Sequence, residues 1–253
     1  LQSKSLFELF PSEFTEGKKN MLINGLVWMG EEQFMKTQIE EKLAQGFSCI
    51  KLKIGAIDFD KELGLLRFIR QNFDAKTIEI RVDANGAFNS NEALSKLNQL
   101  NEFELHSIEQ PIKANQIQEM KLLCQQTPFP IALDEELIGV FGIEKKRKLL
   151  EEIQPQYIIL KPSLVGGFKG TLEWISIAES LNIGWWITSA LESNIGLNAI
   201  TQFTFTLNNP MPQGLGTGGL YTNNFDCPLE IENGHIQYNV TKKWDISNLG
   251  ISI

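Results

Sequence analysis

Histidine is scarce in this 253-residue sequence, which contains only His106 and His235. Serine–histidine hydrolysis and histidine-held metal sites both need imidazoles at fixed places, so both mechanisms are disfavoured. The three cysteines, Cys49, Cys124 and Cys227, are widely spaced and match no zinc or redox motif. We therefore expect reduced thiols in a cytoplasmic protein.

Long apolar runs and an excess of basic residues are also missing. No stretch approaches the ~20 apolar residues that a membrane-spanning helix requires. Residues 1–19 lack the basic start and apolar core of a signal peptide. The formal net charge of −8 disfavours a nucleic-acid surface, which is normally basic. We expect neither membrane nor nucleic-acid partners, and nothing in the sequence specifies an oligomeric state.

Short apolar or β-branched runs alternate with longer segments of helical period from Leu22 onward. This alternation indicates βαβ units and a parallel sheet. The expected strands are 22–28, 49–53, 78–83, 105–109, 130–134, 157–161, 184–189 and a short run ending near Gly214. The expected helices include 31–45, 59–72, 91–101, 117–126, 169–181 and 195–207.

The ends of the expected strands recur at an even interval. From Trp28 to Gly214, consecutive strand ends are 25 to 30 residues apart. One βα unit has about this length, and eight such units close a barrel. No glycine-rich dinucleotide fingerprint follows the first strand, so an open doubly wound sheet is disfavoured. The predicted fold is α/β, of the (β/α)8 type known as a TIM-like barrel.

The two ends of the chain differ from this pattern. Residues 1–21 are irregular and are expected to be a linker, whereas residues 22–219 form the predicted barrel. Residues 220–253 are expected to be a C-terminal tail. Within the tail, residues 229–238 predict a β-hairpin on a type I′ turn at Asn233-Gly234.

Charged residues stand at five successive strand ends, each after an apolar run: Lys53, Asp83, Glu109, Asp134 and Lys161. Side chains two apart share a face of a strand, so Lys51 should point with Lys53. By the same parity Arg81 should point with Asp83, and His106 should face the helices. Parallel strands end at one mouth, where barrel enzymes carry their chemistry. One solvated charge at a strand end is ordinary, but five in succession indicate a site.

The three acids form the core of this predicted site. Asp83, Glu109 and Asp134 would bring three carboxylates within a few ångströms, and such anions raise one another's pKa unless a cation lies between them. Hard oxygen ligands without histidine or cysteine select Mg²⁺, with Mn²⁺ as the alternative. Asn85 and Glu135 follow two of the acids. They are expected either to support the ligands or to be polar turn residues.

The two lysines should lie on opposite sides of the mouth, because they end the second and sixth strands. A lysine beside a divalent cation and another lysine should have a lowered pKa, which allows it to act as a base. Lys51 is the neighbour best placed to lower the pKa of Lys53. A cation that holds a carboxylate, with Lys53 and Lys161 on the two faces of the α-carbon, is suited to removal of the α-proton. The expected partner is therefore a small-molecule carboxylate.

Five short motifs in combination resemble the enolase superfamily. They are K-L-K at 51–53, V-D-A-N at 82–85, I-E-Q-P at 108–111, L-D-E at 133–135 and L-K-P-S at 160–163. The lysine pair is similar to that of the muconate-lactonizing branch. The resemblance implies a (β/α)7β barrel with Mg²⁺ on Asp83, Glu109 and Asp134. It also implies that Lys53 is the base and that Lys161 faces the substrate ring as a cation.

Two further motifs resemble the o-succinylbenzoate synthases within that branch: S-A-L-E-S-N-I-G-L at 189–197 and M-P-Q-G-L-G-T-G at 211–218. That resemblance implies a lyase of menaquinone synthesis. The reaction is syn-dehydration of 2-succinyl-6-hydroxy-2,4-cyclohexadiene-1-carboxylate to o-succinylbenzoate. Ser189 and the backbone around Leu191 and Gly214 match the positions that meet the succinyl end of this substrate.

Three other functions stay open. An N-acylamino-acid racemase would use both lysines as bases, and a muconate-type cycloisomerase would use the same metal and lysine pair. Dipeptide epimerases are disfavoured, because they place Asp-x-Asp where this sequence has Gly214-Leu215-Gly216. From a different class, a barrel without a cap would bind a ligand without turnover.

The resemblance also implies an N-terminal α+β cap whose loops close over the mouth and select the substrate. No such segment precedes residue 22 in this sequence. Either the sequence is part of a longer protein or the barrel stands without its lid. In the second case water exclusion would be poor, and we would expect weak catalysis.

Overall fold

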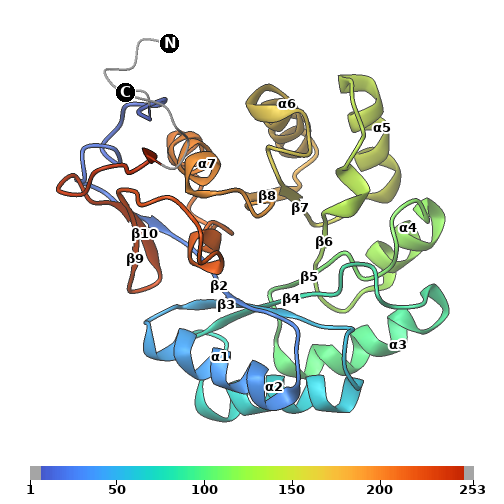
Figure 1. Ribbon diagram of the computed structural model, residues 1–253. Coiled ribbons are helices and arrows are strands. Elements are labelled where there is room, and N and C mark those ends of the chain that lie inside the picture. Colours follow the sequence, from blue (N-terminus) through green and yellow to red (C-terminus); the bar gives the residue numbers. More distant parts are fainter. Residues whose placement is uncertain (1–6, 248–253) are drawn as a thin grey trace.

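Seven parallel strands curl around a central axis, with helices on their outer side, in the computed structural model of the chain (Figure 1). The structure describes residues 7–247. The sheet order is β2-β3-β4-β5-β6-β7-β8, so strands that follow one another in sequence are neighbours in space. The predicted α/β barrel class is confirmed.

The elements follow the predicted alternation closely. The barrel strands are β2 (Gly25–Val27), β3 (Cys49–Lys53), β4 (Glu79–Asp83), β5 (Ser107–Glu109), β6 (Ile131–Leu133), β7 (Tyr157–Leu160) and β8 (Gly184–Ile187). The helices are α1 (Glu32–Ala44), α2 (Phe59–Asn72), α3 (Ser90–Leu100), α4 (Ile117–Gln126), α5 (Ile143–Ile153), α6 (Gly167–Ser180) and α7 (Asn194–Thr206). Of these helices, α5 was not among those named from the sequence. Across residues 7–247, no helix is both long and apolar enough to cross a bilayer.

Local sequence signals explain where helices begin and why they lie outside the sheet. The side chain of Asp58 accepts a hydrogen bond from the Asp60 N–H (3.0 Å) and caps α2. Strand residues that point toward the helices, such as Ile50, Leu52 and Val82, are fully buried. Burial of one such side chain contributes roughly 1.5–3 kcal/mol. The main core therefore lies between the sheet and the helices, which leaves the inner face of the strands for polar side chains.

Residues 213 and 214 lie where an eighth strand would be expected, and their bridges close the barrel. Ile23 forms a parallel bridge with Gln213, and Thr188 forms one with Gly214. The Gly214 N–H donates to the Ile187 carbonyl at 2.8 Å. A Cβ atom on Gly214 would lie 2.2 Å from Thr188 Oγ1, so glycine permits this close approach. The strand predicted to end near Gly214 is thus present only as isolated bridges.

A separate antiparallel sheet lies beside the barrel, in the order β1-β10-β9. Its strands are β1 (Met21–Leu22), β9 (Leu229–Glu232) and β10 (His235–Tyr238). The predicted hairpin is confirmed, with positive φ at both Asn233 and Gly234. The expected strand 22–28 is divided, because its start pairs with β10 and its later part pairs with β3. The sequence pattern did not predict that division.

Candidate active site

The register of the parallel strands brings the predicted charged residues to one mouth. Lys53 and Asp83 are partners in the β3–β4 pair, and Asp83 and Glu109 are partners in the β4–β5 pair. Asp134 and Lys161 directly follow β6 and β7. Because neighbouring strands lie about 4.8 Å apart, five residues distant in sequence become one cluster.

Three lysines pair with the three carboxylates in this cluster. Lys51 Nζ lies 2.6 Å from Glu109 Oε2 and 3.1 Å from Asp83 Oδ2. Lys53 Nζ lies 2.5 Å from the same Asp83 oxygen. On the other side, Lys161 Nζ donates to Asp134 Oδ2. None of the three carboxylate residues is more than 2% exposed, so each depends on its amine partner for charge compensation.

The pKa values of two carboxyl groups move in opposite directions. Burial by itself raises the pKa of Asp83, but the ammonium groups of Lys51 and Lys53 outweigh burial and hold that pKa below its ordinary value. Burial also raises the pKa of Glu109, and the neighbouring Asp83 charge raises it further. Glu109 is therefore the member of the pair that holds a proton more readily.

The pKa of Lys161 is raised, whereas the sequence analysis expected a lowered pKa. Burial lowers its pKa, but the charges of Asp134 and Glu109 raise it by more, so the net pKa is raised. The lowered pKa expected from the sequence assumed a divalent cation beside the lysine. With carboxylates as its described neighbours, Lys161 is held in its charged form.

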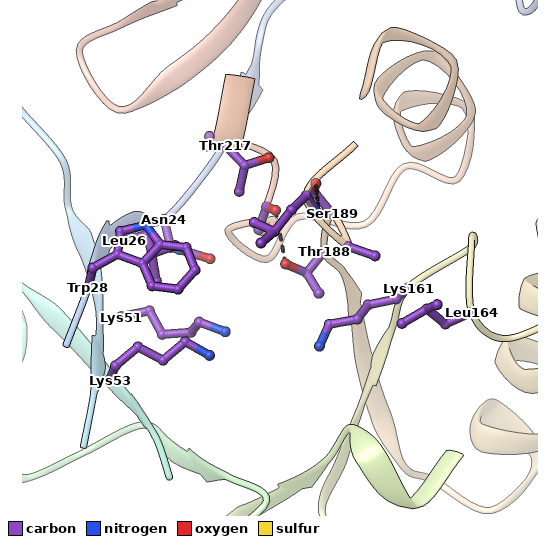
Figure 2. Close-up of a pocket in the computed structure, with 14 residues that line it drawn as sticks. Asn24, Leu26, Trp28, Lys51, Lys53, Lys161, Leu164, Thr188, Ser189 and Thr217 are labelled. Carbon is purple, nitrogen blue, oxygen red and sulfur yellow. Dashed lines mark hydrogen bonds between the residues drawn. The ribbon is translucent and has the colours of Figure 1, made fainter. Parts of the chain in front are cut away.

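A cavity of about 200 Å³ opens between the lysines. Figure 2 shows the amines of Lys51 and Lys53 pointing across it toward Lys161. The predicted substrate contacts Ser189, Leu191 and Gly214 also line this cavity. The acids Asp83, Glu109 and Asp134 are not part of the lining and lie beyond the amines. The site therefore has a charged end, at the carboxylates, and a largely uncharged end, near β2 and residues 188–217.

The donor chemistry at the charged end fits a hard divalent cation. The three acids offer only oxygen atoms, and Glu109 Oε1 is buried without a hydrogen-bond partner among residues 7–247. In the same part of the chain, however, no three His, Cys, Asp or Glu side chains converge as metal ligands. The amines of Lys51 and Lys53 lie at hydrogen-bond distance from two of these carboxylates, Asp83 and Glu109.

The predicted supporting residues divide into two groups. Asn85 and Glu135 belong to the cluster: Asn85 Oδ1 accepts from Lys53 Nζ (2.7 Å), and Asn85 Nδ2 donates to Glu135 Oε1 (2.9 Å). Arg81 lies elsewhere. Its guanidinium donates to Glu79 (2.7 Å) and to the Pro212 carbonyl (2.9 Å), and it covers the Trp186 ring at 4.2 Å. Arg81 thus ties β4 to the segment that closes the barrel.

His106 contradicts its predicted orientation. Its ring lies 4.9 Å from the ring of Tyr157 and 6.0 Å from that of Trp186. These aromatic side chains project inside the barrel, so the prediction that His106 faces the helices is wrong. Strand β5 begins only at Ser107, and the parity rule does not extend to the residue before it. The ring is packed against these two aromatic side chains.

Gln110 is a structural link that the sequence reasoning missed. Its Oε1 accepts from the backbone N–H groups of Asp134 (3.2 Å) and Glu136 (3.3 Å), and its Nε2 donates to Glu136 Oε2 (3.2 Å). The residue is fully buried and has a positive φ of 38°. It therefore joins the end of β5 to the loop that carries Asp134. The available signal was its place directly after Glu109 in the I-E-Q-P motif.

Glu192 is a second missed link, between the loops that follow β7 and β8. Its carboxylate accepts from the Ser163 hydroxyl, from Ser189 Oγ (2.6 Å) and from the Ala190 N–H (2.8 Å). Leu191, beside it, has a φ of 68°, which is uncommon for a side chain other than glycine. The Glu192 contacts therefore fix the loop that presents Leu191 to the cavity.

Replacing Gln110 by methionine should lower the free energy of unfolding by about 2–3 kcal/mol, because the Asp134 and Glu136 N–H groups and Glu136 Oε2 lose the bonds that Gln110 makes to them. We also expect roughly tenfold weaker Mg²⁺ binding, since the Asp134 loop loses its support. Urea denaturation and a Mg²⁺ titration would measure the two effects. Gln118→Met is the control, because the exposed Gln118 side chain donates to Glu152 on the surface of the protein (2.8 Å). Equal losses in both variants would contradict the linking role of Gln110.

Comparison with known proteins identifies the family. Residues 35–242 match the family described as enolase C-terminal domain-like. The chain belongs to this family. The fold class and the motifs at the strand ends agree with that membership.

Individual members of this family are also similar to the chain. It is 57% identical over 227 residues to an o-succinylbenzoate synthase of Desulfotalea psychrophila, covering 90% of this chain and 61% of the relative. The crystal structure of MenC from the same organism superposes with a TM-score of 0.86 at 54% identity, covering 92% of this chain and 64% of that one. An N-succinylamino acid racemase of Thermus thermophilus is 34% identical over 158 residues, or 62% of this chain and 40% of the racemase. The chain thus spans about three fifths of the length of the first two relatives.

Proposed function

We propose that this chain is the catalytic barrel of a Mg²⁺-dependent o-succinylbenzoate synthase, a carbon–oxygen lyase of menaquinone synthesis in the cytoplasm. The main support is the placement of Lys53 and Lys161 on opposite sides of one cavity beside a three-carboxylate cluster. The similarity to the Desulfotalea psychrophila synthase supports the choice of reaction. The proposed substrate is 2-succinyl-6-hydroxy-2,4-cyclohexadiene-1-carboxylate.

In the proposed reaction Lys53 removes the proton from the carbon that bears the carboxylate. The C–H electron pair forms the new ring double bond as the C–O bond at the hydroxyl carbon breaks. The departing hydroxide takes the proton that Lys53 has accepted, and water is the second product. For this step Lys53 must be uncharged at its Nζ, which requires release from Asp83 Oδ2 at 2.5 Å. Asn85 Oδ1, at 2.7 Å, is a neutral acceptor that keeps the amine in position. Lys161 supports the reaction from the opposite side as a cation beside the ring.

Asp83, Glu109 and Asp134 would hold the divalent cation, as in the superfamily that the motifs resemble. When bound, Mg²⁺ supplies positive charge that stabilises the charge developing on the substrate carboxylate. The three acids are all buried, so the surroundings strengthen this electrostatic effect relative to water.

N-acylamino-acid racemisation is the second candidate. It is favoured by the approach of lysines from both sides of the cavity, since a racemase needs a base on each face of the α-carbon. The similarity to the Thermus thermophilus racemase points the same way, although it covers less of the chain. The two candidates share their residues and differ in whether Lys161 transfers a proton.

Product formation compared with proton exchange distinguishes the two candidates. We expect the aromatic product to appear only with Mg²⁺ present, to stop on chelation, and to form faster than N-succinylamino acids exchange their α-proton in deuterium oxide. Ultraviolet absorbance follows the first reaction, and proton NMR follows the second. If exchange and racemisation dominate, the synthase assignment is wrong and the racemase assignment replaces it.

A further inference from the structure

Three polar side-chain atoms around the uncharged end of the cavity have no hydrogen-bond partner among residues 7–247: Asn24 Oδ1, Trp28 Nε1 and Thr217 Oγ1. All three residues line the same cavity as Lys53 and Lys161. Asn24 is 4% exposed and Thr217 is 5% exposed. A buried polar atom without a partner is costly, and native structures contain few of them. Their gathering at one cavity therefore points to a ligand that completes them.

The backbones of these residues are held by hydrogen bonds. Local disorder is therefore not the reason why their side-chain atoms have no partner. The Asn24 N–H donates to the Gln213 carbonyl at 2.9 Å. Gln38 accepts from the Trp28 N–H (2.9 Å) and donates to the Trp28 carbonyl (3.1 Å). Thr217 begins the 3₁₀ helix η3 (Thr217–Leu220). A held backbone with an unpaired side chain is what a preorganised binding subsite requires.

The group that fits this subsite is neutral and accepts hydrogen bonds. Trp28 Nε1 can only donate, Thr217 Oγ1 can donate or accept, and the Asn24 carboxamide offers either its oxygen or, after a half turn, its N–H group. The only charged residues in the lining are the three lysines. Each lysine is already bonded to a carboxylate of the cluster. An anionic group at the subsite would therefore meet polar side chains but no lysine that is free to pair with its charge.

The subsite also lies close to the reacting centre. The Trp28 ring centre is 5.9 Å from Lys53 Nζ. Figure 2 shows Asn24 and Trp28 on the side of Lys51 and Lys53, with Thr217 further along the cavity wall. A group bound there would be attached near the carbon from which Lys53 removes the proton. It would not be the remote end of a long substituent.

We infer that Asn24, Trp28 and Thr217 form a specificity subsite for a neutral carbonyl group that is attached directly to the substrate ring. In the proposed substrate this group is the ketone of the succinyl substituent, and the terminal carboxylate lies outside the subsite. The inference rests on the proposed function for the position of the ring between the lysines. It adds which part of the substituent is recognised and by which residues.

Calorimetric binding with Mg²⁺ present tests this assignment without requiring turnover. Three probes are compared: o-succinylbenzoate, its analogue with CH₂ in place of the ketone, and 2-butanoylbenzoate, which keeps the ketone and lacks the terminal carboxylate. In the native chain, loss of the ketone should weaken binding about tenfold, as expected for one or two hydrogen bonds. In the variants Thr217→Val and Trp28→Phe this penalty should shrink to about twofold or less. The penalty for losing the terminal carboxylate should stay the same in every variant.

The possible results separate the inference from the proposed function. If the variants instead change the penalty for the terminal carboxylate, the subsite binds the ionised end and the inference is wrong. If neither penalty depends on the variants, the three residues do not recognise the ligand. Failure of the native chain to bind any probe would overturn the proposed function, and the inference with it.

Thermal unfolding provides a second readout that a purely structural role would not give. Thr217→Val removes a hydroxyl group that has no partner, so its melting temperature should be unchanged or raised. Thr188→Val is the matched control in the same lining, because Thr188 Oγ1 donates to the Gly214 carbonyl at 2.9 Å. That variant should have a lowered melting temperature. Equal destabilisation by both substitutions would show that the Thr217 hydroxyl is a structural group, against the inference.

Discussion

Replacement of Lys53 by alanine is expected to lower the dehydration rate constant by about 10²–10⁴-fold, the usual contribution of a positioned general base. Mg²⁺ binding should survive, because the three acids proposed as ligands are unchanged. Removal of the amine also frees Asp83 Oδ2 from a contact of 2.5 Å. Steady-state kinetics and a Mg²⁺ titration on the same preparation would measure both properties.

Lys148→Ala provides the control for this substitution, since Lys148 is exposed on α5, away from the site. Its turnover should match that of the native chain. Turnover retained in Lys53→Ala would remove Lys53 from the role of base. Loss of Mg²⁺ binding together with turnover would place the effect on the carboxylate cluster instead of on proton transfer.

The arrangement of the charged cluster was predictable because it depends on periodic features. Parity along β3 and β4 places Lys53 and Asp83 on the inner face, and parallel register makes them neighbours. The even spacing of strand ends then predicts a common mouth. Both rules need only the strand positions, which the alternation of short apolar runs and helical segments supplied.

Contacts that link separate loops could not be derived in the same way. Gln110 reaches Glu136, and Glu192 reaches Ser163, across loops whose conformations depend on positive φ angles at Gln110 and Leu191. A sequence pattern does not predict a positive φ angle at residues other than glycine and asparagine. The position of Arg81 could not be predicted fully either. Strand parity predicted that its side chain points to the same face as Asp83, but it did not predict how far along the barrel axis the guanidinium lies. The unpaired atoms of the cavity are a property of the assembled fold alone.

Replacement of Lys51 by methionine should produce the largest loss of stability. Lys51 bridges Asp83 and Glu109, both almost completely buried, and its own side chain is only 7% exposed. Removing one partner of a buried ion pair costs about 3–5 kcal/mol, because it leaves uncompensated charge in a medium of low dielectric constant. For a chain of this length we expect a fall in melting temperature of roughly 10 °C. Saturating Mg²⁺ should restore a large part of it, since a cation held by the same carboxylates replaces the lost charge.

Lys146→Met separates this electrostatic effect from the general cost of replacing a buried lysine. The Lys146 side chain is even more buried, at 1% exposed, but it bonds to the Gly170 carbonyl (2.9 Å) and to Glu173 Oε2 (2.9 Å), whose side chain is 23% exposed. Water can solvate Glu173 once the lysine is gone, so the loss of stability should be smaller. It should also be independent of Mg²⁺. If Mg²⁺ failed to rescue Lys51→Met, or rescued both variants equally, the carboxylates beside Lys51 would not be the metal ligands.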